Sequence, residues 1–321
     1  MRITLKRSAK LPCKSGRSKF KILFLLILSI LINGVSYAEN IFGNFDCTFS
    51  ARDVSLGEMG ESIPFNPGGI YGNPASIAGV NGILYSEKYM PNPESSGYIH
   101  SAAVFYSQDK FTEYILVQAG FNTASRENEY FNFDFPESQF RKGSAGIACT
   151  PVSNVIIGMG GNVFQDKTAN TNSMVFSGNA GIQIRLRFLT VSACGRNLGF
   201  DSAKNESAML KTISSIYNTG MLLNIFDDIL KIGGQLEFSG DYRLNGYSLG
   251  SEFTFANTIF LRAGYKAPNI DFRQIKNENY SVGAGLKISK ITGDYAVKIN
   301  PDSHERYIHY MTFGIMDIVG N

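Results

Sequence analysis

Residues 230–239 read Leu-Lys-Ile-Gly-Gly-Gln-Leu-Glu-Phe-Ser, so apolar side chains or glycine occupy the even-numbered positions and polar side chains or glycine occupy the odd-numbered ones. Seven segments of this kind follow one another between Ile213 and Met316. A period of two predicts strands with one apolar face and one polar face. A soluble β-sandwich produces the same alternation, so strand length, turn pattern and the chemistry of the polar face must decide between the two folds.

The chain after residue 80 divides into fourteen predicted strands. They are 82–89, 97–107, 112–122, 139–149, 153–163, 173–185, 188–196, 213–223, 229–239, 245–255, 258–266, 279–289, 292–300 and 306–316. Short connections, such as 108–110 and 256–257, alternate with longer polar ones, such as 122–138 and 197–212. An even number of strands with this asymmetry is typical of an outer-membrane barrel. We therefore predict an all-β fold, an antiparallel transmembrane β-barrel of about 14 strands.

The second face of these strands carries glycine, serine, asparagine and threonine mixed with charged side chains. In a barrel such residues line the lumen, while the apolar face contacts lipid. The charged residues that we predict to face the lumen are Arg185, Arg196, Lys231, Glu237, Glu252, Arg262 and Lys287. Tyrosine and phenylalanine are frequent near strand ends, which an aromatic girdle explains, although aromatic residues also favour strands in general.

Residues 1–38 have the composition of a secretory signal peptide. They hold eight of the 30 Lys and Arg residues and no acidic residue, with an apolar core at 22–32 and Ser36-Tyr-Ala38 before the predicted cleavage site. The core is short for a transmembrane helix, and an uncleaved anchor is the alternative. Cleavage near Ala38 leaves 22 basic against 27 acidic residues, a formal net charge of −5. This charge argues against a nucleic-acid partner.

Cysteine and histidine are too sparse for a catalytic or metal site. Cys13 leaves with the leader, and Cys47, Cys149 and Cys194 are too widely spaced for a disulfide framework or a metal-binding pair. The three histidines form no paired-ligand spacing, and no Ser/His/acid set stands out. We therefore expect no enzyme activity, metal or cofactor. Cys194 falls on the predicted lumen face, and a disulfide to Cys47 is a hypothesis that the sequence cannot decide.

Residues 39–80 differ from the rest of the chain, because glycine, asparagine and proline interrupt every period. We predict irregular chain with short turns, or a single helical turn after Asn73-Pro74. Glycines within the predicted strands, at 158–161, 233–234 and 283–285, either leave room for this segment inside the barrel or ease the curvature of the wall. The predicted organisation is a signal peptide (1–38), a plug or hatch (39–80) and a barrel (81–321).

The same segment carries a recognisable pattern: Ala51-Arg52, Ser55-Leu-Gly57, Met59-Gly60 and then Tyr71-Gly-Asn-Pro-Ala-Ser-Ile-Ala-Gly79. It resembles the N-terminal signature of the PorV/PorQ group of FadL-like outer-membrane barrels, and Glu58 separates its Leu-Gly and Met-Gly pairs. The resemblance implies a 14-stranded barrel with a plug or hatch. The residues that match this motif are Leu56, Gly57, Met59, Gly60, Asn73, Pro74 and Ala75.

The resemblance implies two functions. A PorV/PorQ-type protein would be a non-enzymatic component of protein secretion or outer-membrane assembly, with exported proteins as partners. The aromatic and acidic stretch 123–138 would then be a partner surface, or simply strand extensions above the membrane. The alternative is a FadL-like channel for hydrophobic small molecules, with the hatch opening around residues 73–75. Many lumen charges argue against an acyl-chain path. Either protein would lie among the lipids of the outer membrane of a diderm, Gram-negative-type bacterium.

Overall fold

The computed structural model describes residues 50–91, 95–124, 139–167, 172–199, 215–268, 270–271, 274–275, 278–301 and 307–318. The predicted signal peptide, the start of the predicted plug at 39–49 and most of the predicted partner surface at 123–138 lie outside these residues. No helix in the described part of the chain is long and apolar enough to cross a membrane.

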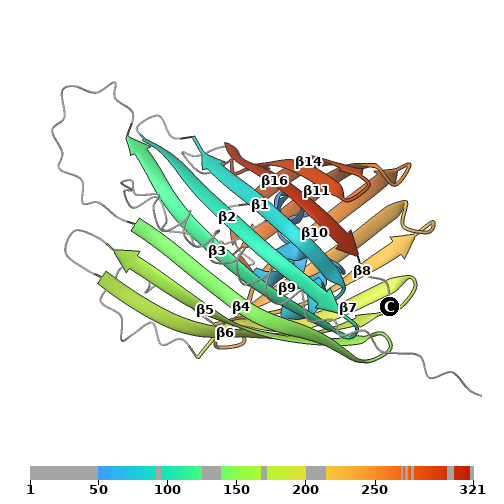
Figure 1. Cartoon of the computed structure of the whole chain (residues 1–321). Coiled ribbons are helices and arrows are strands. Elements are labelled where there is room, and N and C mark those ends of the chain that lie inside the picture. The colour runs from blue at the N-terminus through green and yellow to red at the C-terminus, as the bar shows by residue number, and fades with distance from the viewer. Residues whose placement is uncertain are drawn as a thin grey trace, which may run out of the picture. The chain divides into compact units, whose positions relative to one another are not determined.

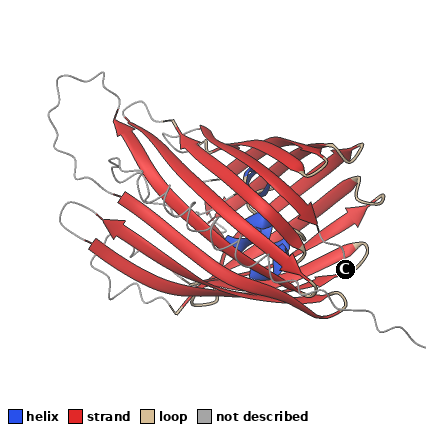
Figure 2. Cartoon of the chain, viewed as in Figure 1, coloured by secondary structure: helices blue, strands red, loops and turns tan. Residues whose placement is uncertain are grey.

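Fourteen strands close into an antiparallel barrel, which confirms the predicted fold (Figure 1, Figure 2). They are β1 (Val80–Met90), β2 (Ser95–Gln108), β3 (Phe111–Ala124), β4 (Gln139–Val152), β5 (Val155–Lys167), β6 (Asn172–Arg185), β7 (Leu189–Leu198), β8 (Ile216–Ile225), β9 (Leu230–Ser239), β10 (Leu244–Phe255), β11 (Ile259–Pro268), β14 (Asn279–Ile288), β15 (Ile291–Ile299) and β16 (Tyr307–Ile318). Each strand pairs with its neighbour along the chain, and β1 pairs with β16, from Val80 opposite Ile318 to Tyr89 opposite His309.

A small hairpin between β11 and β14 was not predicted. It consists of β12 (Ile270–Asp271) and β13 (Gln274–Ile275). Strands of two residues are too short to show a period, so hydrophobic patterning cannot detect them.

The short turns at one end of the barrel use residues with positive φ. Asp109, Asn154, Asp227 and Asn257 have φ between 52° and 75°. Tight hairpin turns require such left-handed conformations, because they match the twist of the flanking strands, and asparagine and aspartate adopt them at low cost. The longer connections lie at the other end of the strands, so the predicted asymmetry is present.

The two faces of the wall differ as the alternation predicts. Outward side chains such as Phe176, Met159 and Ile315 are more than 60% exposed, whereas the inward Gln183 and Glu252 are at most 1% exposed. An apolar outer face around a polar interior is the pattern of a transmembrane barrel.

Residues 50–79, called here the N-terminal segment, form four short helices: α2 (Ala51–Ser55), η1 (Gly60–Ser62), η2 (Pro67–Tyr71) and η3 (Pro74–Ile77). The side chains of Ser50, Asn66 and Asn73 cap three of them by accepting from backbone N–H groups two residues ahead. Proline stands first in both η2 and η3, where its missing N–H costs nothing. The predicted turn after Asn73-Pro74 is therefore present as η3.

Candidate functional site

Inward-facing glycines on seven strands between β5 and β14 contact the N-terminal segment. The contacts run around the wall from Gly158 (beside Pro74 and Ala75) through Gly181 (Asn73), Gly220 (Ser62), Gly233 (Met59), Gly250 (Leu56) and Gly264 (Gly57) to Gly283 (Ser55). A Cβ at Gly264 would lie 2.0 Å from the backbone nitrogen of Gly57, and one at Gly158 would lie 2.3 Å from that of Ala75. These glycines, called here the glycine ring, leave space that the segment fills.

The other glycines singled out in the sequence have different neighbours. A Cβ at Gly160 would lie 2.1 Å from the Tyr114 hydroxyl oxygen, and one at Gly285 would meet Asp294. Gly234 has the outward Leu249 as its nearest side chain. Room for the segment therefore explains Gly158, Gly233 and Gly283, but not the remaining glycines.

The first half of the sequence motif, residues 56–60, packs along the glycine ring. Leu56 and Met59 are buried in a small apolar cluster with Ile63 and Leu222 of β8. Gly57 has φ +69°, and a Cβ there would lie 2.6 Å from the carbonyl oxygen of Tyr265. Gly60 lies against the carboxyl group of Asp53. Each of these positions needs either a small residue or an apolar one.

The second half of the motif ties two parts of the segment to β6. Asn73 Nδ2 donates to the carbonyl oxygens of Glu61 (3.1 Å) and Ile182 (3.3 Å). Pro74 opens η3, and the fully buried Ala75 packs over Gly158. From β6, Arg185 donates to the carbonyl oxygens of residues 75, 76 and 78 at 3.0–3.2 Å.

One layer of charges lies on the short-turn side of the glycine ring and centres on Glu252 of β10. Its carboxylate accepts two bonds from Arg52 of the segment (3.0 Å each), one from Arg262 (2.6 Å) and one from Lys231 (3.3 Å). Arg262 also donates to Asp294 of β15 at 2.6 Å. This lower charge layer joins four wall strands, β9, β10, β11 and β15, to α2, and Glu252 is 1% exposed.

A second layer lies on the long-loop side of the ring. Glu58 of the segment accepts from Lys266 (2.7 Å) and Lys298 (2.5 Å). Arg196 pairs with Glu237 of β9 (3.0 Å) and with Glu61 of the segment (3.6 Å). Acidic residues of the segment therefore bind basic residues of the wall, and we call this set the upper charge layer.

Six of the seven charged residues predicted to face the lumen either contact the segment directly or are members of the two charge layers. Lys287 stands apart, half-buried near the short turn that follows β14 and opposite Thr292. Sequence reasoning did not single out Arg52 as a partner in the lower layer or Glu58 in the upper one. Glu58, which interrupts the resemblance motif, is the residue that binds two wall lysines.

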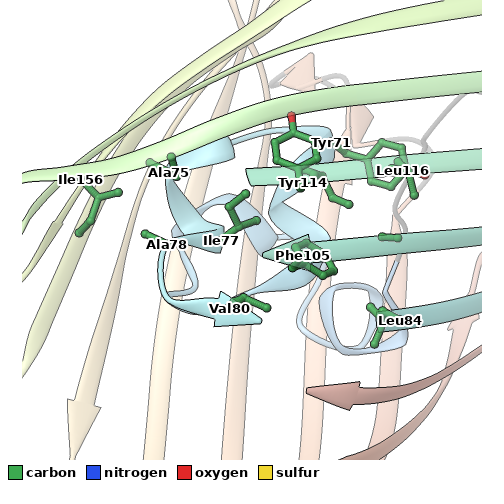
Figure 3. Close-up of a cluster of buried hydrophobic side chains, with 13 residues drawn as sticks. Tyr71, Ala75, Ile77, Ala78, Val80, Leu84, Phe105, Tyr114, Leu116 and Ile156 are labelled. Carbon is green, nitrogen blue, oxygen red and sulfur yellow. The ribbon is translucent and has the colours of Figure 1, made fainter. Parts of the chain in front are cut away.

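A third region of the lumen is apolar. Side chains from β1–β5 form one buried cluster with η2 and η3 of the segment (Figure 3). Leu84, Phe105, Tyr114 and Leu116 belong to the wall, and they contact the region of Ile70, Tyr71 and Ile77. The lumen therefore has an apolar sector on β1–β5, with the buried Lys142 of β4 at its edge, and a charged sector whose wall residues lie on strands from β7 to β15.

A polar cavity of about 20 Å³ lies where the segment meets the charged sector. It is lined by three glycines of the segment, at 60, 68 and 72, and by Asp53, Glu58, Glu61, Tyr71, Arg196, Gln235, Glu237 and Lys266. Such a volume holds about one water molecule. The cavity itself therefore has no space for a larger molecule.

We expect docking of the segment to depend on pH through Asp53. Burial raises the pKa of its carboxyl group to about 7, although Asn66 Nδ2 donates to Oδ1 at 2.7 Å. In a released segment the Asp53 carboxyl group would have the ordinary aspartate pKa near 4. The docked state then binds more protons between about pH 4 and 7, so docking weakens as pH rises through this window, by up to about tenfold per unit.

We expect amide hydrogen exchange of residues 50–79 to speed up between pH 5 and pH 7.5 beyond the intrinsic effect of pH. Asp53→Asn keeps an oxygen that accepts from Asn66 but cannot ionise, so its protection factors should stay constant over this range. Protection factors that change equally in both proteins would show that another group controls docking.

The described residues contain no group of three or more His, Cys, Asp or Glu that could hold a metal ion. Within the described residues Cys149 and Cys194 form no disulfide, and Cys194 is buried on the lumen face as predicted. Cys47 lies outside the described residues, so its pairing with Cys194 stays a hypothesis.

Comparison with known proteins identifies the fold alone. No protein-family profile and no curated protein sequence matches the chain. Among solved structures, it is similar to the Pseudomonas putida toluene transporter TodX (TM-score 0.56, 10% identity, covering 82% of this chain and 95% of that one). It is also similar to the Ralstonia pickettii toluene transporter TbuX (0.58, 10%, 85% and 98%) and to a Pseudomonas aeruginosa FadL homologue (0.52, 10%, 85% and 99%).

Proposed function

We propose that this protein is a non-enzymatic outer-membrane channel that passes small hydrophobic molecules and that the N-terminal segment closes it. The observation that carries the proposal is the division of the lumen into an apolar sector and a charged sector. A path for an apolar molecule needs an apolar wall, and Leu84, Phe105, Tyr114 and Leu116 of β1–β3 supply one against η2 and η3.

The two halves of the segment are held in different ways. Residues 51–61 bind the wall through Arg52, Glu58 and Glu61, whose ion pairs are buried. Residues 70–78 bind the apolar sector through Ile70, Ile77 and neighbouring side chains. Movement of η2 and η3 would uncover apolar wall while the charged anchor stays in place, so hydrophobic passage does not require the ion pairs to break.

The similar solved structures support this proposal over a role in secretion. Two are toluene transporters and one is a FadL homologue by name, and all share the 14-stranded type of barrel. The basic and apolar leader supports export and cleavage near Ala38. The exposed apolar belt supports a position among outer-membrane lipids.

Substitution in the apolar sector tests the channel. Expressed in the outer membrane of a diderm host, the wild-type chain should raise toluene uptake above that of the empty host. Leu116→Asn places an amide in the apolar wall at nearly constant volume, which costs a passing hydrocarbon about 1–3 kcal/mol. Uptake should therefore fall roughly 5- to 150-fold.

Leu222→Asn is the matched control, because Leu222 is an equally buried, inward leucine of β8 beside the charged anchor. It should retain most of the uptake. Heat-modifiable gel mobility should show that each variant forms a barrel. Uptake equal to that of the empty host, or equal loss in both variants, would contradict the proposed path.

A PorV/PorQ-type role in protein secretion or assembly is the second candidate. The sequence pattern of residues 51–79 favours it, since those residues resemble the signature of that group. Purification in mild detergent from crosslinked cells tests it. Near-stoichiometric recovery of exported proteins, together with no effect on toluene uptake, would favour this role over the channel.

A further inference from the structure

A buried lysine lies between two aromatic rings at the edge of the apolar sector. The Nζ atom of Lys142 is 4.0 Å from the centroid of the Tyr71 ring and 4.8 Å from that of the Phe164 ring. Lys142 is 4% exposed and Phe164 is less than 2% exposed. A cation over an aromatic face is attracted more strongly when both groups are removed from water.

The two rings come from different parts of the protein. Lys142 and Phe164 face each other on the wall, in register on β4 and β5. Tyr71 is the last residue of η2 in the N-terminal segment, and the backbone oxygens of residues 70 and 71 accept from Asn179 of β6. The segment therefore places a single aromatic ring against a cation and a ring that belong to the barrel.

The surroundings of Lys142 combine apolar side chains with one buried polar atom. Leu116 and Tyr114 of β3 belong to the same cluster as Tyr71. Oε1 of Gln118 is buried without a hydrogen-bond partner in the described part of the chain. Gln118 is directly opposite Lys142 in the β3–β4 register. A ligand with an aromatic ring and one hydroxyl group would satisfy such a site.

We propose that Lys142, Phe164, Leu116 and Gln118 form a binding site for a monocyclic phenol and that Tyr71 occupies this site in the closed channel as a built-in mimic of the ligand. The inference rests on the proposed channel and names the chemical class of one substrate. Tyr71 also lines the polar cavity, so its departure joins that cavity to the space that its ring vacates. Ligand binding then competes with docking of η2 and links the substrate to opening.

The test uses p-cresol, which is the tyrosine side chain from Cβ outward, with the full-length purified protein in detergent. Isothermal titration should show that Tyr71→Ala binds p-cresol about tenfold more tightly than wild type, because an internal competitor is removed. In the same variant 4-methylcyclohexanol, of similar size but not aromatic, should bind roughly fivefold more weakly than p-cresol. Titration into protein-free micelles corrects for partitioning.

Three further variants separate this site from a simple cavity. Tyr71→Phe keeps the ring and should bind p-cresol no more tightly than wild type. Lys142→Met in the Tyr71→Ala background keeps the length of the side chain without the charge, so the preference for p-cresol over 4-methylcyclohexanol should disappear. Tyr71→Leu removes the ring but fills the space, and it replaces Tyr71→Ala if that variant does not give a heat-modifiable barrel.

Equal affinities of wild type and Tyr71→Ala, or equal binding of the aromatic and saturated probes, would overturn the inference. Toluene uptake by the same proteins keeps this result separate from the proposed function. Uptake without p-cresol binding would leave a hydrocarbon channel that lacks this site. Binding without uptake would leave a phenol site in a protein that is not such a channel.

Discussion

Gly264→Ala should displace residues 55–59 from the barrel wall and open the lumen. The added Cβ would lie 2.0 Å from the backbone nitrogen of Gly57 and 2.5 Å from the carbonyl carbon of Leu56. Backbone atoms on both sides cannot rotate away as a flexible side chain could. Overpacking of this kind costs about 1–3 kcal/mol, so the population of released segment should rise roughly 5- to 150-fold.

Single-channel recording in planar bilayers measures this effect as the fraction of time spent in a conducting state. Gly161→Ala is the matched control, since it adds the same methyl group to the wall with no atom closer than 4.0 Å. It should conduct like wild type. If Gly264→Ala stays as closed as Gly161→Ala while the barrel remains intact, then the glycine ring does not hold the segment.

The fold could be predicted from the sequence because each strand carries its own signal. Residues 230–239 show the period of two, and β9 runs from Leu230 to Ser239. The predicted strand at 153–163 begins at Val155 instead, because Asn154 takes a positive φ in the turn. Short turns with aspartate and asparagine separate the strands, so local chemistry alone sets their number and order.

The charged wall residues could be predicted to face the lumen, but their partners could not. Glu252 alternates with apolar neighbours, whereas Arg52 lies 200 positions earlier in a segment with no period. Which residue of the N-terminal segment contacts which strand depends on how the segment folds across the glycine ring. No pattern within either stretch contains that information.

The sequence leaves open whether the strand glycines make room for the segment or ease the curvature of the wall. The face on which they lie distinguishes the two roles. Gly233, Gly250, Gly264 and Gly283 lie on the same face of their strands as the charged residues, as the register shows. Glycines that ease curvature need not share a face. Repeated inward-facing glycines on neighbouring strands therefore indicate that another part of the same chain approaches the wall closely. The structure places residues 55–59 there.

Glu252→Gln should have the largest effect on stability, because it removes the negative charge that Arg52, Arg262 and Lys231 share. Asp294 remains as a partner of Arg262, but Arg52 and Lys231 lose the carboxylate that they bind in the lower layer. Breaking a buried ion pair by removing one partner costs about 3–5 kcal/mol, since the remaining charge stays buried. We expect a lower thermal unfolding midpoint and faster hydrogen exchange in residues 50–55.

A double-mutant cycle with Arg52→Gln tells whether this loss concerns the segment or the wall alone. If the Arg52–Glu252 ion pair holds the segment, the double variant should be more stable than the sum of the two single effects predicts. In the double variant neither of these two positions carries a buried charge without its partner. Glu113→Gln on the exposed face of β3 removes the same charge and should change the midpoint little. Additive effects of Arg52→Gln and Glu252→Gln would mean that the wall cations Arg262 and Lys231 account for the loss, and that the segment is held by the glycine ring and the upper charge layer.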